Sequence, residues 1–365
     1  MKVILDEVCE RESSNLKQSD VINSNGGYPI YGAAGYIGNV DFYHQGNPYI
    51  AVVKDGAGIG RATLLPAYSS VIGTMQYLIP KSNVLPEYLY YVIRNMHLEK
   101  YYTGATIPHI YFKDYKKETF NLSSIEEQRK IVDILGKVER IIEARTLEME
   151  QFNILIRARF VEMFGNVDTG NYRYKTYKLG DVASVGSSHR VFTTEFVEKG
   201  VPFYRGTEIG ELANGIKPTE PYFISKEQYN RLANDDTKPQ IGDLLMPSIC
   251  NKGQVWMVDT KEPFYYKDGR VLCISPDREI FDTKYLEYFM RVKTLVTYPK
   301  LGSGSTFAEF KIFLLKGIDV LVPPRNLQEQ FADFVRQVDK SKAAIQKSLD
   351  ETQLLFDSLM QKYFG

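Results

Sequence analysis

The densest interleaving of basic and aromatic residues in the sequence lies between Arg94 and Lys117. Lysines and arginines in such a run can contact DNA phosphates, while tyrosine and histidine side chains can reach the edges of bases. This composition predicts a DNA-facing surface, although a solvated helix end followed by a strand edge would have the same residue types. The residues are Arg94, His97, Lys100, Tyr101, Tyr102, His109, Tyr111, Lys113, Tyr115, Lys116 and Lys117.

Further candidates for DNA binding lie in polar loops of both halves of the chain. Loops on a rigid scaffold are where binding residues concentrate and where two similar domains are free to differ. The segments 187–190, 251–252 and 267–270 are such loops in the second half. The complete predicted set is Lys54, Arg61, His109, Lys113, Lys116, His189, Arg190, Arg205, Lys252 and Arg270.

The chain lacks the residue patterns that catalysis, a cofactor or a metal would need. The segment 47–49 (Asn-Pro-Tyr) lacks the second proline of an adenine-methylating Asp/Asn-Pro-Pro-aromatic loop. The glycine-rich segment 56–61 fits no phosphate-binding loop and predicts a tight turn between strands. Asp277 and Asp282 superficially resemble a nuclease pair, but capping of the following helix explains them more simply. We therefore predict no catalytic, cofactor-binding or metal-binding residue and no enzyme activity in this chain.

The amino-acid composition says more about where in the cell the protein works than about what it binds. Lysines plus arginines number 45, as do aspartates plus glutamates, so a DNA-binding surface must come from local clustering of charge. Cys9, Cys250 and Cys273 are far apart and include no CxxC pair, which predicts reduced, mostly buried thiols in a cytoplasmic protein. No apolar run approaches the roughly 18 residues that span a bilayer, so no membrane partner is expected.

Two long stretches have the period of a helix with one apolar seam. Between residues 131 and 163 apolar side chains recur at steps of four and three, and the same steps recur between 331 and 363. The first stretch is entered through Ser124, a favourable N-cap, with acids in its first turn. Arg145 and Arg159 interrupt the first seam, where acids of an opposite helix or contacts with a partner subunit would each accommodate them.

A single helix of this length would expose its whole apolar seam to water, so two matching seams predict an intramolecular coiled coil. The predicted seam residues are Ile131, Leu135, Val138, Ile142, Met149, Phe152, Ile156, Val335, Val338, Ile345, Leu349, Phe356 and Leu359.

Short motifs recur in the same order in the two halves of the chain, which indicates an internal duplication. The matched pairs are 5–8 with 179–182, 28–31 with 201–204, 49–53 with 241–246, 88–92 with 285–289, 104–107 with 304–307 and 125–128 with 327–330. The predicted fold class is α+β, with two similar mixed α/β domains separated by the coiled coil of two long helices in a pseudo-twofold internal repeat. The predicted boundaries are 1–122 and 166–322 for the mixed domains, and 123–165 and 323–365 for the helices.

This order of parts resembles, over the whole chain, the specificity subunit of type I restriction-modification enzymes. Residues 124–132 (Ser-Ile-Glu-Glu-Gln-Arg-Lys-Ile-Val) look like the family's central conserved region, and 104–110 are similar to the end of its target recognition domain. The second copy departs from these patterns, because Gln328 replaces an acid, Phe331 stands where a basic residue is common and segment 304–307 lacks the proline.

The resemblance implies two target recognition domains, each reading one half of a split double-stranded DNA site, held apart by an antiparallel coiled coil. It also implies two modification (methyltransferase) subunits and restriction (endonuclease/translocase) subunits as partners. Those partners would carry the S-adenosylmethionine, ATP and Mg sites that are missing here. The alternative is a coiled-coil protein-interaction scaffold without DNA readout, which would show no salt-dependent, sequence-selective DNA binding.

Overall fold

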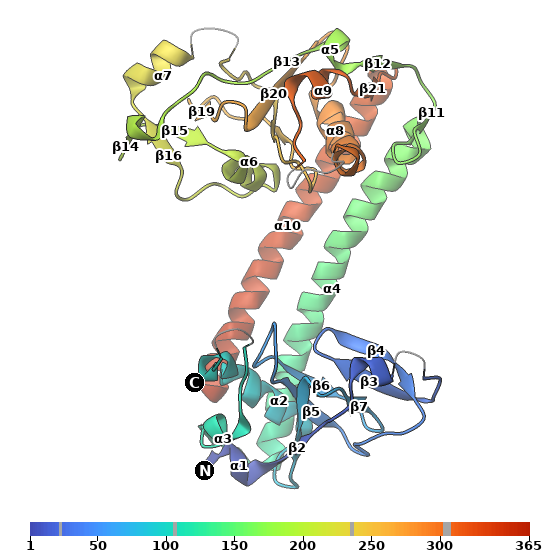
Figure 1. Cartoon of the computed structure of the whole chain (residues 1–365), viewed down its shortest axis with the longest axis vertical. Coiled ribbons are helices and arrows are strands. Elements are labelled where there is room, and N and C mark those ends of the chain that lie inside the picture. Colours follow the sequence, from blue (N-terminus) through green and yellow to red (C-terminus); the bar gives the residue numbers. More distant parts are fainter. Residues whose placement is uncertain (22–23, 105–107, 234–236, 302–307) are drawn as a thin grey trace. The chain divides into compact units, whose positions relative to one another are not determined.

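The chain folds into two units, and each unit contains one half of each long helix. Unit 1 consists of Met1–Glu148 with Ile345–Gly365, and unit 2 of Met149–Ala344. The long helices are α4 (Ile125–Phe164) and α10 (Arg325–Phe364). The computed structural model in Figure 1 describes residues 1–21, 24–104, 108–233, 237–301 and 308–365.

Unit 1 is built around a four-stranded sheet of order β2-β8-β5-β6, accompanied by a three-stranded sheet β4-β3-β7 and the strand pair β1-β9. Its strands are β1 (Lys2–Ile4), β2 (Cys9–Ser13), β3 (Tyr28–Gly32), β4 (Gly35–Val40), β5 (Tyr49–Val53), β6 (Ala62–Leu65), β7 (Ser70–Val71), β8 (Met75–Pro80) and β9 (Thr119–Asn121). Its other helices are α1 (Leu5–Val8), α2 (Pro86–Asn95) and α3 (Phe112–Tyr115), with 3-10 turns at Gln18–Asp20 and Leu98–Tyr101.

Strand β5 is buried along its full length because it separates two apolar layers. Successive side chains of a strand point to opposite faces. Ile50 and Val52 accordingly belong to the core shared with α2 and α4, whereas Tyr49, Ala51 and Val53 pack in a second core toward β7.

Unit 2 repeats this plan with a four-stranded sheet β13-β20-β17-β18, a second sheet β14-β16-β15-β19 and the strand pairs β12-β21 and β10-β11. Its strands are β10 (Gly165–Asn166), β11 (Asn171–Tyr172), β12 (Thr176–Lys178), β13 (Ala183–Gly186), β14 (Phe196–Val197), β15 (Val201–Tyr204), β16 (Tyr222–Ile224), β17 (Leu244–Pro247), β18 (Trp256–Met257), β19 (Tyr265–Tyr266), β20 (Val271–Pro276) and β21 (Asp319–Leu321). Its other helices are α5 (Leu179–Val182), α6 (Gly206–Ala213), α7 (Lys226–Leu232), α8 (Thr283–Thr297) and α9 (Ile312–Lys316), with 3-10 turns at Thr193–Glu195 and Tyr298–Lys300.

The duplication that the sequence predicts is confirmed strand by strand. Strands β5 and β17 hold the same place in the two four-stranded sheets, as do β8 and β20, which are followed by α2 and α8. Strands β3 and β15 each pair antiparallel with one neighbour and parallel with another. Unit 2 differs mainly by the additional helices α6 and α7. Residues 105–107 and 304–307, which carry most of the repeated Gly-Ala-Thr and Gly-Ser-Thr motifs, lie outside the described residues.

The predicted seam residues are shared between the cores of the two units. In unit 1 the start of α4 packs antiparallel to the end of α10, where Ile131, Leu135, Val138 and Phe356 are buried in one core with α2. In unit 2 the end of α4 meets the start of α10, and Ile156, Val335 and Val338 are buried in the core with α8. Ile345 is also buried, while Ile142, Met149, Phe152, Leu349 and Leu359 are half-buried. Three further aromatic residues complete the core of unit 2, namely Phe160 and Phe164 from α4 and Phe331, at which the second apolar stretch begins.

The arginines in the first seam are accommodated within their own helix. Arg145 pairs with Glu148 at 2.9 Å, and Arg159 pairs with Glu162 at 2.7 Å. Each partner lies three residues further along α4, where side chains share one face. The acids that face both arginines therefore come from α4 itself, and contact of either arginine with a partner subunit stays a prediction.

Local predictions about caps, turns and thiols are confirmed. The Ser124 hydroxyl accepts a hydrogen bond from the Glu127 amide at 3.3 Å, and the Asp282 carboxylate accepts two from the first turn of α8. Gly56, Gly58 and Gly60 all have positive φ in the loop between β5 and β6, which is the predicted tight turn. All three cysteines are buried, and burial raises the pKa of the Cys9 thiol to about 12.

The part of the chain that the structure describes contains neither a metal-binding cluster nor a membrane-spanning helix. Within ranges 1–21, 24–104, 108–233, 237–301 and 308–365, no group of three or more His, Cys, Asp and Glu side chains is placed to hold a metal ion. In the same part of the chain, no helix has the length and apolar character needed to cross a membrane.

Candidate nucleic-acid interface

In unit 1 the loop after β5 meets the segment that precedes α3. The Gly56 amide donates to the Pro108 carbonyl at 2.9 Å, and the Ile110 amide donates to the Lys54 carbonyl at 3.0 Å. His109 consequently lies against Asp55, with which its Nδ1 forms an ion pair when the ring is protonated. These backbone bonds bring together two predicted site residues, Lys54 and His109, that are far apart in the sequence.

The side chains at this meeting point combine cations with an exposed aromatic ring. The ammonium of Lys54 lies 3.2 Å from the Asp55 carboxylate. The rings of His109 and Tyr111 are 4.2 Å apart, and the Lys113 ammonium lies 5.1 Å from the centre of the Tyr111 ring. We call Lys54, Asp55, His109, Tyr111 and Lys113 the unit-1 junction.

Two other predicted DNA-binding residues of unit 1, Arg61 and Lys116, bond to groups outside the unit-1 junction. The Arg61 guanidinium donates to the backbone carbonyl of Ala33. The Lys116 ammonium pairs with Asp6 at 3.1 Å, next to the N-terminal strand. Neither side chain belongs to the unit-1 junction.

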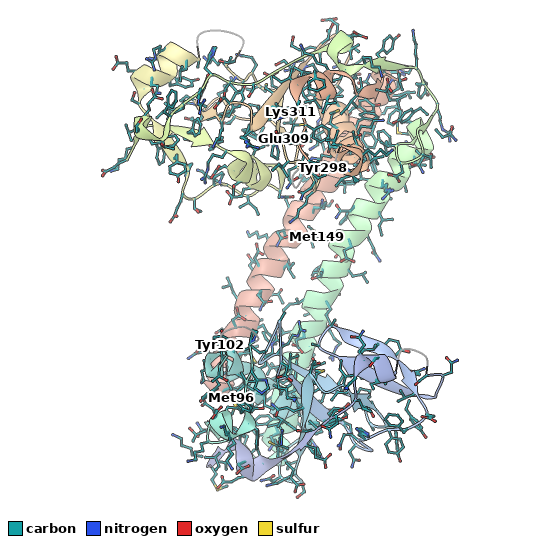
Figure 2. All side chains as sticks on the ribbon, viewed as in Figure 1. Met96, Tyr102, Met149, Tyr298, Glu309 and Lys311 are labelled. Carbon is teal, nitrogen blue, oxygen red and sulfur yellow. The ribbon has the colours of Figure 1, made fainter. Side chains whose placement is uncertain are left out.

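Unit 2 has the same meeting point with different side chains. Arg270 donates to Glu309 at 2.7 Å, and Lys311 pairs with the same carboxylate. The hydrogen bond from Lys311 holds the pKa of Glu309 below its ordinary value, so the carboxylate stays charged. Figure 2 shows the side chains of Glu309 and Lys311 next to each other. The Ser187 hydroxyl accepts from the Gly269 amide at 2.8 Å, next to Arg270. We call Ser187, Ser248, Arg270, Glu309 and Lys311 the unit-2 junction.

The two junctions share one backbone frame. In unit 1 the Lys54 amide donates to the Thr74 carbonyl and the Lys54 carbonyl accepts from Ile110, both at 3.0 Å. In unit 2 the Ser248 amide donates to the Arg270 carbonyl at 2.8 Å, and the Ser248 carbonyl accepts from the Phe310 amide at 2.7 Å. Lys54 therefore corresponds to Ser248, Thr74 to Arg270 and His109 to Glu309. The frame is duplicated, while the side chains that it presents differ at every one of these positions.

A second surface of unit 2 combines arginines with exposed aromatic rings. Arg205 lies 4.5 Å over the Tyr222 ring, which stacks on Phe196 with 4.7 Å between ring centres. Burial opposes ionisation of Glu208, but hydrogen bonds from Arg205 nevertheless hold the pKa of this carboxyl below its ordinary value. Arg190 lies 5.0 Å over the exposed Phe192 ring. Such pairs of a guanidinium with an aromatic face suit nucleic-acid contacts.

The last two predicted residues, His189 and Lys252, lie in loops of unit 2. His189 is exposed, and its amide donates to the Tyr265 hydroxyl at 2.9 Å. Lys252 is exposed in the loop after β17, where its amide donates to the Gln254 side chain at 3.0 Å. Sequence reasoning selected cations and missed the carboxylates that orient them, Asp55, Glu208 and Glu309. Asp55 stands next to Lys54 and Glu208 lies three residues after Arg205, so these two acids could have been found by reading the neighbours of the predicted cations. Glu309 could not, because Arg270 lies 39 positions away.

Comparison with known proteins relates most of the chain to one family. A family model described as the type I restriction modification DNA specificity domain matches residues 1–151 and 171–352. The specificity subunit of the type I restriction enzyme MjaIX from Methanocaldococcus jannaschii is 22% identical over 316 residues, which are 78% of this chain and 69% of that protein.

Solved structures share the fold at low sequence identity. The S subunit of a type I restriction-modification system from M. genitalium has a TM-score of 0.63 and 16% identity, covering 100% of this chain and 96% of that one. A chain from a study of complex assembly and conformational transition of the type I R-M system has a TM-score of 0.54 and 16% identity, covering 100% of this chain and 97% of that one.

Proposed function

The chain belongs to the type I restriction-modification DNA specificity family as a non-catalytic specificity subunit, and we propose that its two recognition domains each read one half of a split double-stranded DNA site. The observation that supports this proposal best is the duplicated junction. One backbone frame carries Lys54 and His109 in unit 1 but Ser248 and Glu309 in unit 2. Two domains that recognise different base sequences need such a constant frame with variable side chains.

The chemistry of each junction suits a different task in DNA recognition. Arg270 is exposed and held by a charged carboxylate, so its guanidinium is oriented before DNA arrives. An oriented guanidinium can donate two parallel hydrogen bonds to O6 and N7 of guanine. In unit 1 the cations Lys54 and Lys113 suit phosphate contacts, while His109 and Tyr111 suit base edges.

We assign catalysis to partner subunits. Two modification (methyltransferase) subunits would hold S-adenosylmethionine, and restriction (endonuclease/translocase) subunits would hold ATP and Mg. The proposed site of action is the cytoplasm, where DNA and the methyl donor are available. The coiled-coil scaffold without DNA readout is not favoured, because the family match covers the segments that form both junctions.

Methylation by the assembled complex tests this function directly. We expect the chain, mixed with its modification subunit and S-adenosylmethionine, to direct methylation to one bipartite sequence, which sequencing of the methylated host genome would identify. Deleting residues 178–322 should abolish that methylation, because one half-site loses its reader. Unchanged methylation after this deletion would contradict the proposal that two domains read the site.

Exposed apolar pairs on the long helices are the proposed docking points for the two modification subunits. Ile154 and Leu155 in α4 are 66% and 47% exposed, and Leu354 and Leu355 at the equivalent turn of α10 are 69% and 51% exposed. Neighbouring apolar side chains left in water at equivalent places of a duplicated structure indicate two copies of one partner.

Replacing Leu354 and Leu355 by serine should remove one of the two modification subunits. Burying two leucines contributes about 3 kcal/mol, so we expect roughly a hundredfold weaker binding at that site. Native mass spectrometry would then find one modification subunit per chain. The matched control, serine at Ile154 and Leu155, should leave the Leu354 site occupied. Two modification subunits on the Leu354/Leu355 variant would refute this docking point.

A further inference from the structure

A buried glutamine joins each recognition domain to the start of its long helix. In unit 1 the Gln128 side chain of α4 is 0% exposed. Its Oε1 accepts from the Leu85 amide at 2.8 Å, and its Nε2 donates to the carbonyls of Asn83 at 3.1 Å and Ser123 at 3.0 Å. The amide thus ties the loop before α2 to the first turn of α4 and has no unpaired donor.

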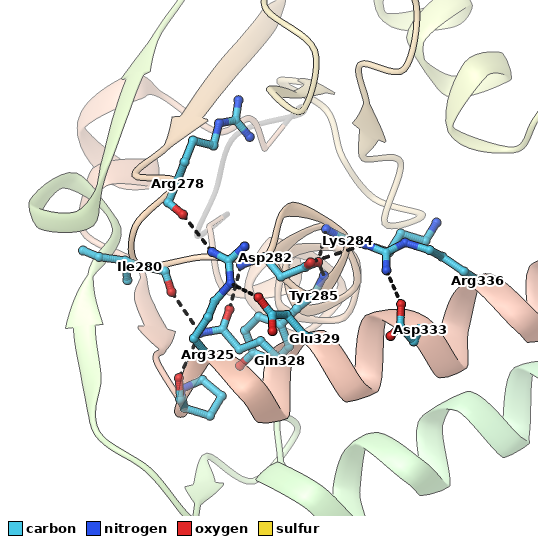
Figure 3. Close-up of polar contacts among 11 residues, drawn as sticks. Arg278, Ile280, Asp282, Lys284, Tyr285, Arg325, Gln328, Glu329, Asp333 and Arg336 are labelled. Carbon is cyan, nitrogen blue, oxygen red and sulfur yellow. Dashed lines mark hydrogen bonds and ion pairs between the residues drawn. The ribbon is translucent and has the colours of Figure 1, made fainter.

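Unit 2 repeats this arrangement bond for bond (Figure 3). Gln328 in α10 is also 0% exposed. Its Oε1 accepts from the Asp282 amide at 3.0 Å, and its Nε2 donates to the carbonyls of Ile280 at 3.0 Å and Pro323 at 2.9 Å. The sequence match of 125–128 with 327–330 is therefore wrong by two residues. The match paired similar residue types, whereas the buried contacts make Gln328, and not Gln330, the counterpart of Gln128.

A buried tyrosine beside each glutamine adds a second duplicated bond. The Tyr88 hydroxyl in α2 donates to the Asn121 carbonyl at 3.1 Å, and the Tyr285 hydroxyl in α8 donates to the Leu321 carbonyl at 3.1 Å. Both carbonyls belong to the last strand before a long helix, β9 or β21. The helix packed on the sheet is thereby bonded to the segment that leads into the long helix.

The end of the other long helix packs on the same tyrosine. Phe364, at the end of α10, meets Tyr88 edge to face with 5.3 Å between ring centres. Phe164, at the end of α4, meets Tyr285 in the same way at 5.1 Å. In each unit the end of one long helix thus packs on the tyrosine whose hydroxyl is bonded to the strand that leads into the other long helix.

We infer that Gln128–Tyr88–Phe364 and Gln328–Tyr285–Phe164 are positioning joints, which fix the direction in which each recognition domain is held on the helix pair. This inference rests on the proposed function, because that direction would then determine which spacing between half-sites is accepted. An apolar residue at 128 or 328 would also fill the volume. A side-chain amide that bonds to three backbone groups also fixes how the loop is oriented on the helix, because all three bonds are satisfied in one orientation of the loop only.

The test uses the complex with its modification subunits and DNA duplexes that carry both half-sites. The spacer in these duplexes has the natural length or is one base pair shorter or longer. We expect Gln128→Leu to reduce the preference for the natural spacer about tenfold, equivalent to about 1.4 kcal/mol. Gln328→Leu should act in the same direction. Tyr88→Phe removes the hydroxyl that bonds to the Asn121 carbonyl at 3.1 Å and to the Ser123 hydroxyl at 3.5 Å, and keeps the ring. It should reduce the preference about threefold, which keeps the inference testable if a glutamine variant does not fold.

A control must separate a general loss of protein stability from a change in the direction in which a recognition domain is held. Val71→Ala removes two methyl groups from a core cluster that contains none of the six joint residues, so it should lower the melting temperature without changing spacer preference. The inference is overturned if Gln128→Leu and Tyr88→Phe lower the melting temperature while keeping the wild-type spacer preference. No methylation of any split site by the wild-type complex would instead refute the proposed function.

Discussion

Inserting four helical residues after Glu148 and four after Ala344 is expected to change the spacer that the complex accepts by about two base pairs, with both half-sites unchanged. Four residues lengthen a helix by about 6 Å, and base pairs along DNA rise by about 3.4 Å. Methylation of duplexes with a graded series of spacers would show the shift.

The insertion points follow from the division of the chain into units. Both lie at the boundary between unit 1 and unit 2, so the buried residues of either core keep their neighbours. Lys342 in α10 donates to the Asn153 side chain in α4 at 2.9 Å, which places the two insertion points at matching levels of the helix pair.

A one-sided insertion is the control for this experiment. Four extra residues in α4 alone would move its seam out of register with α10, so we expect the complex to lose methylation at every spacer. A paired insertion that leaves the preferred spacer at its natural length would show that the helices do not set the separation of the half-sites.

Arg270→Ala is expected to lower methylation of the natural site by about tenfold to a hundredfold and to relax base preference at one position of one half-site. A well-placed bidentate contact to guanine is worth about 1–3 kcal/mol of discrimination. Steady-state methylation of duplexes substituted at each position of both half-sites would locate that base pair. The other half-site should keep its preference, because unit 1 has threonine at the equivalent position.

Glu309→Gln tests whether the carboxylate orients the arginine. The amide keeps the size of the side chain but removes the charge that pairs with Arg270 at 2.7 Å. We expect a smaller loss than for Arg270→Ala, at the same base pair. Arg231→Ala is the matched control, since Arg231 is an exposed arginine of unit 2 that also pairs with a glutamate, at 3.6 Å, but lies outside the unit-2 junction. Equal losses for Arg231→Ala and Arg270→Ala would show that Arg270 contributes only general positive charge.

The long helices, their caps and the order of the duplicated parts were predictable from local sequence patterns. The seam between 131 and 163 and the caps at Ser124 and Asp282 depend on side chains within a few turns of one another. Such local patterns survive in any tertiary context, which is why the fold class was predictable. Neutral overall charge and the missing catalytic motifs likewise needed no structure, since they depend only on which residues are present.

Which side chains lie in contact could be seen only in the tertiary structure. Lys116 is neutralised by Asp6, 110 positions away, and Arg270 is oriented by Glu309, 39 positions away. The role of Gln128 depends on a loop 43 positions earlier, so its helix pattern alone marks it as one polar residue among several. Periodicity carries no information about such pairs, because loop geometry brings them together. The structure shows which of the ten predicted DNA-binding residues lie close together, and the assignment of any of them to DNA stays a prediction.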